Sequence, residues 1–226
     1  MLEIKSLHKS YRKKEVLRDI NLSFRPGVIS GVVGKNGAGK TTLFRCIAGL
    51  EKYVGTIAYS EGELANLTGF LSTNPYYLAK LTGKEYLQLL CNGRNIPLPD
   101  LSTANIFDLP LEQYAATYST GMKKKLALTG VLLQKNEIFI LDEPFSGVDI
   151  ESNLLLQEVL KKLRSLNKIV LISSHVFPVL EEICDNLNYL ENGQIKSMAA
   201  GKEDFTKIAE EMSGVGVAKR VEGLDL

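Results

Sequence analysis

The chain has 226 residues, and its 27 basic and 26 acidic side chains leave a formal net charge of +1. This balance argues against broad electrostatic binding of nucleic acid, so no nucleic-acid partner is expected. The three cysteines (Cys46, Cys91 and Cys184) lack metal-ligand spacing and indicate free thiols in a reducing compartment. Neither a signal peptide nor the ~18 consecutive apolar residues of a spanning helix is visible, which predicts a cytosolic chain with one domain.

The first third of the chain contains short apolar runs around a glycine-rich segment. Taken in chain order, the residues predict a strand through Leu2, Ile4 and Leu7, strands at 21–24 and 28–33, a glycine loop at 34–39, a helix at 40–50, and strands at 55–59 and 69–71. The order of strand, glycine loop and helix at 28–50 is typical of a phosphate site.

The rest of the chain alternates helices with strands. It predicts a helix at 82–91, mixed loop and short helix at 92–116, a helix at 121–133, a strand at 138–141, a helix at 151–166, a strand at 168–173, a helix at 177–184, a hairpin turning at Asn192-Gly193, and a loose tail at 213–226. Because strands alternate with helices, we expect an α/β fold with a mainly parallel sheet.

Two helix faces can be assigned from residue spacing. The core face of the 151–166 helix is predicted to hold Leu154, Leu155, Leu156, Val159, Leu160 and Leu163. The three consecutive lysines at 123–125 predict a solvated helix face.

The glycine loop matches the pattern G-x-x-x-x-G-K-[ST] without a mismatch, from Gly34 to Thr41. Its glycines let backbone N–H groups turn toward phosphate oxygens, and the following helix presents its positive end to the same anion. We expect Lys40 to reach the β- and γ-phosphates and Thr41 to offer its hydroxyl to Mg²⁺. The alternative is a chance match in a glycine-rich turn, and the position between a strand and a helix favours the nucleotide site.

Two carboxylates follow the apolar run at 138–141. Asp142 ends the predicted strand, where a P-loop protein needs an acidic residue to help hold Mg²⁺. Glu143 is one residue further and is placed to polarise an attacking water or take its proton. A solvated acidic turn before Pro144 is the alternative, and the P-loop makes it the less favoured one.

Together these motifs resemble the ATP-binding cassette (ABC) ATPases, the nucleotide-binding subunits of ABC transporters. Walker A is 34–41, Walker B is 138–142, and Ser119-Thr120-Gly121 occupies the signature position. Residues 146–149 resemble the D-loop and residues 173–175 the switch-histidine loop. The resemblance covers residues 1–204, with the motifs in the family's order.

The resemblance implies a P-loop NTPase fold with a RecA-like core, an N-terminal antiparallel β subdomain and an inserted helical subdomain at about 74–134. Residues 205–226 would form a C-terminal helix and a tail. In this family two subunits associate head to tail, with each ATP between one Walker A and the partner's signature. The implied ATP-binding residues are Tyr11 (stacking on adenine), Val16, Asn36, Gly37, Ala38, Gly39, Lys40, Thr41, Thr42, Ser119, Gly121 and Asp149.

The resemblance also assigns the chemistry. Glu143 is implied as the catalytic base, His175 as the group that positions the γ-phosphate and water, and Lys40 as a transition-state cation. The implied Mg²⁺ residues are Thr41, Asp142 and Thr73.

The sequence departs from the family pattern at three places. Tyr118, Thr120 and Met122 replace residues of the usual Leu-Ser-Gly-Gly-Gln signature, and Tyr-Ser-x-Gly-Met resembles the variant of ABC-2-type exporter ATPases. Thr73 occupies the position of the glutamine loop, whose glutamine ordinarily contacts Mg²⁺ and senses the membrane subunit. The interval from Thr73 to Ser119 is short, which predicts a reduced helical subdomain.

We therefore predict an Mg-ATP-hydrolysing subunit that dimerises with itself or a related ABC subunit. It would drive an integral membrane permease, in the export direction, from the cytoplasmic face of the membrane. One alternative is a soluble ABC ATPase that acts outside transport, although no coiled-coil insertion, zinc cysteines or second cassette is visible. Another is a weakly hydrolysing regulatory module, which Thr73 keeps open.

Overall fold

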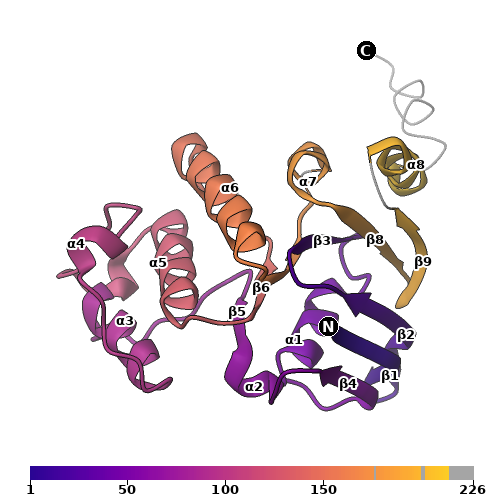
Figure 1. Ribbon diagram of the computed structural model, residues 1–226, viewed down its shortest axis with the longest axis horizontal. Helices are drawn as coiled ribbons and strands as arrows, with labels where there is room; N and C mark the ends of the chain where they lie inside the picture. The colour runs from indigo at the N-terminus through magenta and orange to yellow at the C-terminus, as the bar shows by residue number, and fades with distance from the viewer. Residues whose placement is uncertain (176, 200–201, 214–226) are drawn as a thin grey trace, which may run out of the picture.

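The computed structural model describes residues 1–175, 177–199 and 202–213. The chain forms a small antiparallel sheet near the N-terminus and a larger sheet beside it, and the longer helices lie mainly on the far side of the larger sheet (Figure 1). Most of the predicted tail, residues 214–226, lies outside the described residues.

The smaller sheet has the strand order β2-β1-β4, with β1 at Leu2–Tyr11, β2 at Lys14–Phe24 and β4 at Val54–Tyr59. Strand β2 is longer than the 21–24 segment that the sequence predicted. It pairs antiparallel with β1 along its whole length, and this ladder recruits the charged residues before position 21 into the strand.

The larger sheet has the order β5-β6-β7-β3-β8-β9, and its first five strands are parallel. Its strands are β3 (Val28–Val33), β5 (Thr68–Leu71), β6 (Ile138–Asp142), β7 (Ile169–Ser173), β8 (Asn186–Glu191) and β9 (Gln194–Ala199). Strand β9 is antiparallel to β8 and follows the predicted turn, where Asn192 and Gly193 have φ of 50° and 77°. The expected mainly parallel α/β sheet is confirmed.

The helices are α1 (Lys40–Ile47), α2 (Leu64–Leu67), α3 (Gly83–Asn92), α4 (Leu101–Ala104), α5 (Thr120–Leu133), α6 (Ile150–Ser165), α7 (Phe177–Ile183) and α8 (Lys202–Ser213), with a 3-10 turn η1 at Ala115–Thr117. Helix α1 ends three residues before its predicted limit. Gly49 has a φ of 74° and turns the chain away, which leaves Leu50 57% exposed.

Alternate residues of the central strands face two different cores. In β6, Ile138 and Ile140 pack in the core formed with α1 and the smaller sheet, whereas Phe139 and Leu141 pack toward α5 and α6. This period of two is what a sheet covered on both faces requires. The layered arrangement fixes the carboxyl ends of β3, β6 and β7 beside one another.

The segment between β5 and β6 carries α3, α4, η1 and α5, which lie beyond the β5 edge (Figure 1). Helix α3 begins with a capping box in which Thr82 and Glu85 satisfy each other's backbone N–H groups. The subdomain limits at 74–134 and the boundary at 204 stay predictions, and α8 runs across the latter. Within the described ranges, no helix is both long enough and apolar enough to cross a bilayer.

One predicted core residue is wrong. Leu154 is 58% exposed, whereas Leu156, Leu160 and Leu163 of the same helix are buried. These three follow the spacing i, i+4, i+7, and position 154 lies about 200° around the helix from position 156. The leucine therefore projects from the opposite face of α6.

Candidate nucleotide site

The loop between β3 and α1 encloses an open space at the carboxyl end of β3. Gly34, Gly37 and Gly39 all have positive φ, at 156°, 83° and 114°. A Cβ atom at Gly34 would lie 2.2 Å from the Leu190 carbonyl oxygen, so this glycine lets the loop pack against β8. A Cβ atom at Gly37 would meet nothing within 4 Å, so bare backbone faces the space that an anion would enter.

Lys40 is the first residue of α1, and only 8% of it is exposed. Its Nζ donates hydrogen bonds to the carbonyl oxygens of Gly34 (2.7 Å) and Lys35 (3.4 Å). Burial lowers the pKa of the Lys40 ammonium, and the nearby carboxylates of Glu143 and Asp142 oppose that shift. The site thus holds a partly desolvated cation beside the loop.

Asp142 is the last residue of β6 and accepts hydrogen bonds from three hydroxyl groups. Thr41 Oγ1 and Thr73 Oγ1 each donate to its Oδ2 at 2.7 Å, and Ser173 Oγ donates to its Oδ1 at 2.5 Å. Asp142 and Ser173 are register partners on the parallel strands β6 and β7. The strand register therefore fixes this buried carboxylate, which is 1% exposed.

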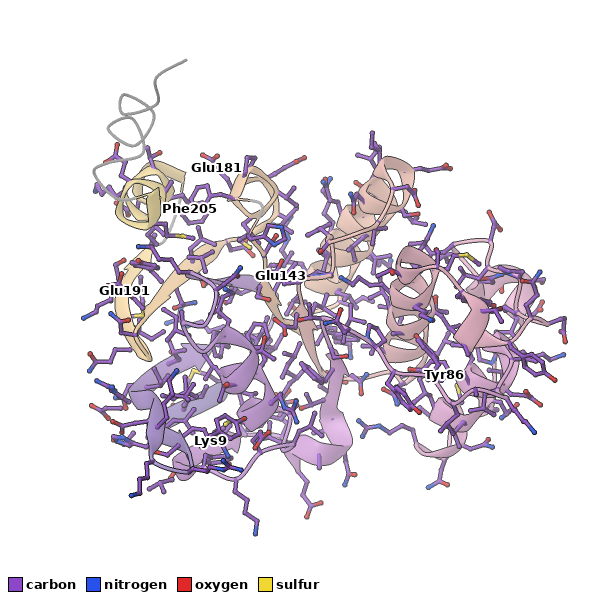
Figure 2. All side chains as sticks on the ribbon, turned by 180° about the vertical axis from the view of Figure 1, so that it is seen from behind. Lys9, Tyr86, Glu143, Glu181, Glu191 and Phe205 are labelled. Carbon is purple, nitrogen blue, oxygen red and sulfur yellow. The ribbon has the colours of Figure 1, made fainter. Side chains whose placement is uncertain are left out.

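Glu143 follows immediately and leaves the strand with a φ of 54°. Its backbone N–H donates to Ser173, at 3.0 Å to Oγ and 3.2 Å to the carbonyl oxygen. Its Oε2 lies 2.7 Å from His175 Nδ1 and accepts the His175 backbone N–H at 3.2 Å. Figure 2 places Glu143 centrally, between the part of the molecule that holds Lys9 and the part that holds Tyr86.

These groups surround one cavity of about 260 Å³. All the residues that line it were predicted site residues: Val16, Asn36, Gly37, Gly39, Lys40, Thr41, Thr42, Thr73, Asp142 and Glu143. A lysine, hydroxyl groups and carboxylates dominate the lining, so the cavity suits a metal-bound phosphate ester better than an apolar ligand.

Tyr11 and Ala38 lie next to the cavity but do not line it. Tyr11 is 41% exposed, its hydroxyl interacts with Thr42, and the Lys9 ammonium lies 4.5 Å from the centroid of its ring. Ala38 is buried, and its carbonyl oxygen accepts a hydrogen bond from Gly193 in the β8–β9 turn at 3.2 Å. Ala38 therefore attaches the glycine loop to the β8–β9 turn, on the side away from the cavity.

Ser119, Gly121 and Asp149 are not brought to this cavity. Ser119 is exposed and caps α5, as the sequence predicted, and Gly121 lies in the first turn of that helix. Asp149 caps α6, where it accepts the Ser152 backbone N–H at 2.9 Å and forms an ion pair with Lys125 at 2.8 Å. These three residues belong to a second surface of the same chain.

The oxygen atoms at the cavity fit Mg²⁺. This ion prefers hard oxygen ligands and usually binds through one or two carboxylates together with substrate phosphates. Thr41, Thr73 and Asp142 bring such oxygens together, and the described residues contain no group of three or more His, Cys, Asp or Glu side chains that could hold a metal ion. Bound there, Mg²⁺ would supply charge neutralisation for the phosphates.

Lys124 corrects the predicted solvated lysine face. It is 3% exposed, and its Nζ donates to the carbonyl oxygens of Glu143 and Ser146, both at 2.8 Å. The signal that identifies it is helical spacing, because positions 127, 128 and 131 are apolar and buried and share its face of α5. The contacts of Ser173 with Asp142 and Glu143 are not visible in the sequence, because they depend on the pairing of β6 with β7.

Comparison with known proteins agrees with this geometry. A family model described as "ABC transporter" matches residues 17–146. The uncharacterized ABC transporter ATP-binding protein YthP of Bacillus subtilis is 31% identical over 191 residues, which cover 81% of this chain and 79% of the relative. A solved ATP-binding subunit of an ABC transporter superposes with a TM-score of 0.80 at 26% identity, over 98% of both chains. A dimeric ATP-binding cassette with bound ADP and Pi shares the fold (TM-score 0.80, 20% identity, 88% of this chain and 98% of that chain).

Proposed function

Because the chain belongs to the ABC transporter family as an ATP-hydrolysing cassette, we propose that it turns over Mg-ATP at an interface between two cassettes and drives a separate membrane permease. The observation that carries this proposal is the convergence of Thr41 and Thr73 on Asp142, one residue before Glu143 and beside the P-loop lysine.

The residues around the cavity divide the reaction among themselves. The backbone N–H groups of the glycine loop and the Lys40 ammonium bind and orient the phosphates. Glu143 takes the proton of the attacking water, and His175, which contacts its Oε2, keeps that carboxylate in place. Lys40 also stabilises negative charge that develops as the γ-phosphate leaves.

A second cassette supplies what the cavity lacks. Ser119 is exposed at the amino end of α5, away from the cavity of its own chain, and a helix start of this kind binds anions. We propose that Ser119 and Gly121 grip the γ-phosphate of ATP held by the partner, which is a copy of this chain or a related ABC subunit. The dimeric form of a cassette with the same fold supports this arrangement.

The membrane partner, the direction and the location rest on family resemblance. The cassette would act at the cytoplasmic face of the membrane, bound there by an integral permease. Its Tyr118-Ser119-x-Gly121-Met122 segment resembles the ABC-2-type exporters, which supports export.

Affinity capture of the full chain in mild detergent, followed by identification of the co-purified proteins, tests the partner. We expect an integral membrane chain with the fold of an exporter permease, and steady-state turnover at saturating Mg-ATP. An importer permease would overturn the direction. Capture of a ribosomal or DNA-repair assembly, or an absence of turnover, would instead favour the non-transport or regulatory alternatives.

A further inference from the structure

The central lysine of the triplet in α5 is a buried cation between two functional segments. Lys124 is 3% exposed, whereas Lys123 beside it is only half-buried and Lys125 pairs with Asp149. Taking an ammonium out of water is unfavourable unless strong hydrogen bonds replace its hydration. Burial lowers the pKa of Lys124, and the charges of Glu143 and the neighbouring Walker B aspartate oppose this.

The two acceptors of Lys124 define what it holds. They are the backbone carbonyl oxygens of Glu143 and Ser146, both at 2.8 Å, so the ammonium binds the start and end of the turn that follows β6. The Ser146 N–H also donates to the Glu143 carbonyl at 3.2 Å. Glu143 has a φ of 54°, a left-handed conformation that is unfavourable for residues with a side chain. Two charge-assisted hydrogen bonds hold the chain in this conformation.

The conformation of that turn sets the direction of the catalytic carboxylate. On its other side, the Glu143 N–H is bonded to Ser173, and the Glu143 carboxylate is bonded to His175. Lys124 is thus the attachment from α5, opposite the attachments from β7 and the segment after it. Loss of the α5 attachment leaves the backbone of the base held from one side.

The same helix begins at the segment Ser119 to Gly121, which is proposed to bind the γ-phosphate held by the partner. Ser119 caps α5 one turn and a half before Lys124, and Gly121 packs so closely on the turn that a Cβ there would lie 2.7 Å from the Gly147 carbonyl oxygen. Helix α5 thus contacts the 143–147 turn at two places, Gly121 and Lys124. With both contacts in place, we expect a displacement of Ser119 to reach Glu143.

We propose that Lys124 is a positioning residue for Glu143. It links the start of α5, which is proposed to bind the partner's γ-phosphate, to the catalytic base of the same chain. The inference rests on the proposed function. In a dimer, this link makes the base at one ATP respond to the phosphate held by α5 at the other. It predicts a defect in the hydrolytic step with little change in ATP binding.

Lys124→Met tests the proposal, because it keeps the length of the side chain and removes the donor. We expect kcat to fall about 100-fold, as for a displaced catalytic group, with the ATP Kd unchanged within about threefold. Lys124→Arg restores donors and should recover most of the lost kcat. Lys123→Met, on the same helix turn, is the matched control and should behave as the parent. Thermal unfolding is recorded for each variant.

The outcomes separate this inference from the proposed function. A parent without turnover would overturn the proposed function itself. If the parent is active and Lys124→Met keeps its kcat, only the positioning role fails. It fails too if Lys124→Met and Lys124→Arg both lose ATP binding in parallel with thermal stability, which describes a purely structural lysine. Should Lys124→Met not fold, Lys124→Gln decides, because it is shorter and carries no charge: a lower kcat with intact ATP affinity and folding supports the role, and parental kcat contradicts it.

Discussion

The Thr73 hydroxyl donates a hydrogen bond to Asp142 Oδ2 at 2.7 Å, and Thr41 reaches the same oxygen at the same distance. Thr73 therefore contacts the carboxylate that is predicted to help hold Mg²⁺, although it is shorter than the glutamine that the family resemblance implies there. The position retains contact with the nucleotide site through a hydroxyl group. This contact argues that the loop after β5 still takes part in the nucleotide site.

Replacing Thr73 by valine tests this contact. Valine preserves the shape of the side chain and removes the donor, so Asp142 Oδ2 keeps only the hydrogen bond from Thr41. We expect the Mg²⁺ concentration for half-maximal ATPase activity to rise about tenfold, as for other losses of a group that orients a metal ligand. Thr73→Ser keeps the hydroxyl and should titrate like the parent. An unchanged Mg²⁺ requirement in Thr73→Val would assign the orientation of Asp142 to Thr41 and Ser173 alone.

Glu143→Gln should bind ATP, hydrolyse it very slowly and accumulate as a dimer. The amide keeps hydrogen-bonding capacity toward His175 but cannot take a proton, so turnover is expected to fall at least ~100-fold. Size exclusion with light scattering in Mg-ATP measures the dimer. Glu151→Gln, an exposed carboxylate in the first turn of α6, is the matched control. Parental turnover in Glu143→Gln would contradict the assignment of the base.

Local spacing was sufficient to predict the P-loop, because Gly34, Lys40 and Thr41 act within eight consecutive residues around one turn. Asp142 was also predictable, since it ends a short apolar run whose length and β-branched residues favour a buried strand. In both cases the chemistry follows from residues that are neighbours in sequence.

Contacts between distant segments were not predictable in the same way. Three consecutive lysines predict a solvated helix face, whereas the buried position of Lys124 depends on how α5 packs against the turn after β6. Ser173 holds both carboxylate-bearing residues only because β6 and β7 pair in one particular register. Ser119 and Asp149 lie outside the cavity of their own chain, so their predicted role requires a second cassette.

Asp149 should contribute to stability in a pH-dependent manner. The hydrogen bond from Lys125, with those from Ser152, holds the pKa of the Asp149 carboxyl well below its ordinary value of 3.8. The charged form therefore stabilises the fold above pH 3.8, and this contribution is lost as pH falls through the folded-state pKa.

Urea unfolding of Asp149→Asn, without nucleotide, measures this contribution. Asparagine still caps α6 but carries no charge, so the variant should be less stable than the parent at pH 7. The difference should shrink as the pH is lowered below 3.8. Asp149→Ala also loses the cap and should remain less stable than Asp149→Asn at both pH values. A difference between Asp149→Asn and the parent that is independent of pH would contradict the ion pair as its source.

Mixing two inactive variants tests whether ATP is shared between cassettes. Lys40→Ala loses the ammonium of the P-loop and should bind ATP poorly, whereas Lys35→Ala, at an exposed lysine of the same loop, should not. Ser119→Glu places a carboxylate where the partner's γ-phosphate would bind, and an acidic residue at a helix start is compatible with folding. Each variant alone should lack ATPase activity, because both sites of its homodimer are damaged.

In a mixed dimer, the Lys40 of one chain and the Ser119 of the other are both intact at one of the two ATP sites. An equimolar mixture should therefore regain up to about a quarter of the parental activity, since about half the dimers are mixed and each holds one intact site of two. If instead Lys40 and Ser119 acted on the same nucleotide within one chain, no chain in the mixture would carry both intact, and activity would stay absent. Recovery on mixing requires that the start of α5 completes the site of another copy, because no rearrangement within a single chain supplies both residues.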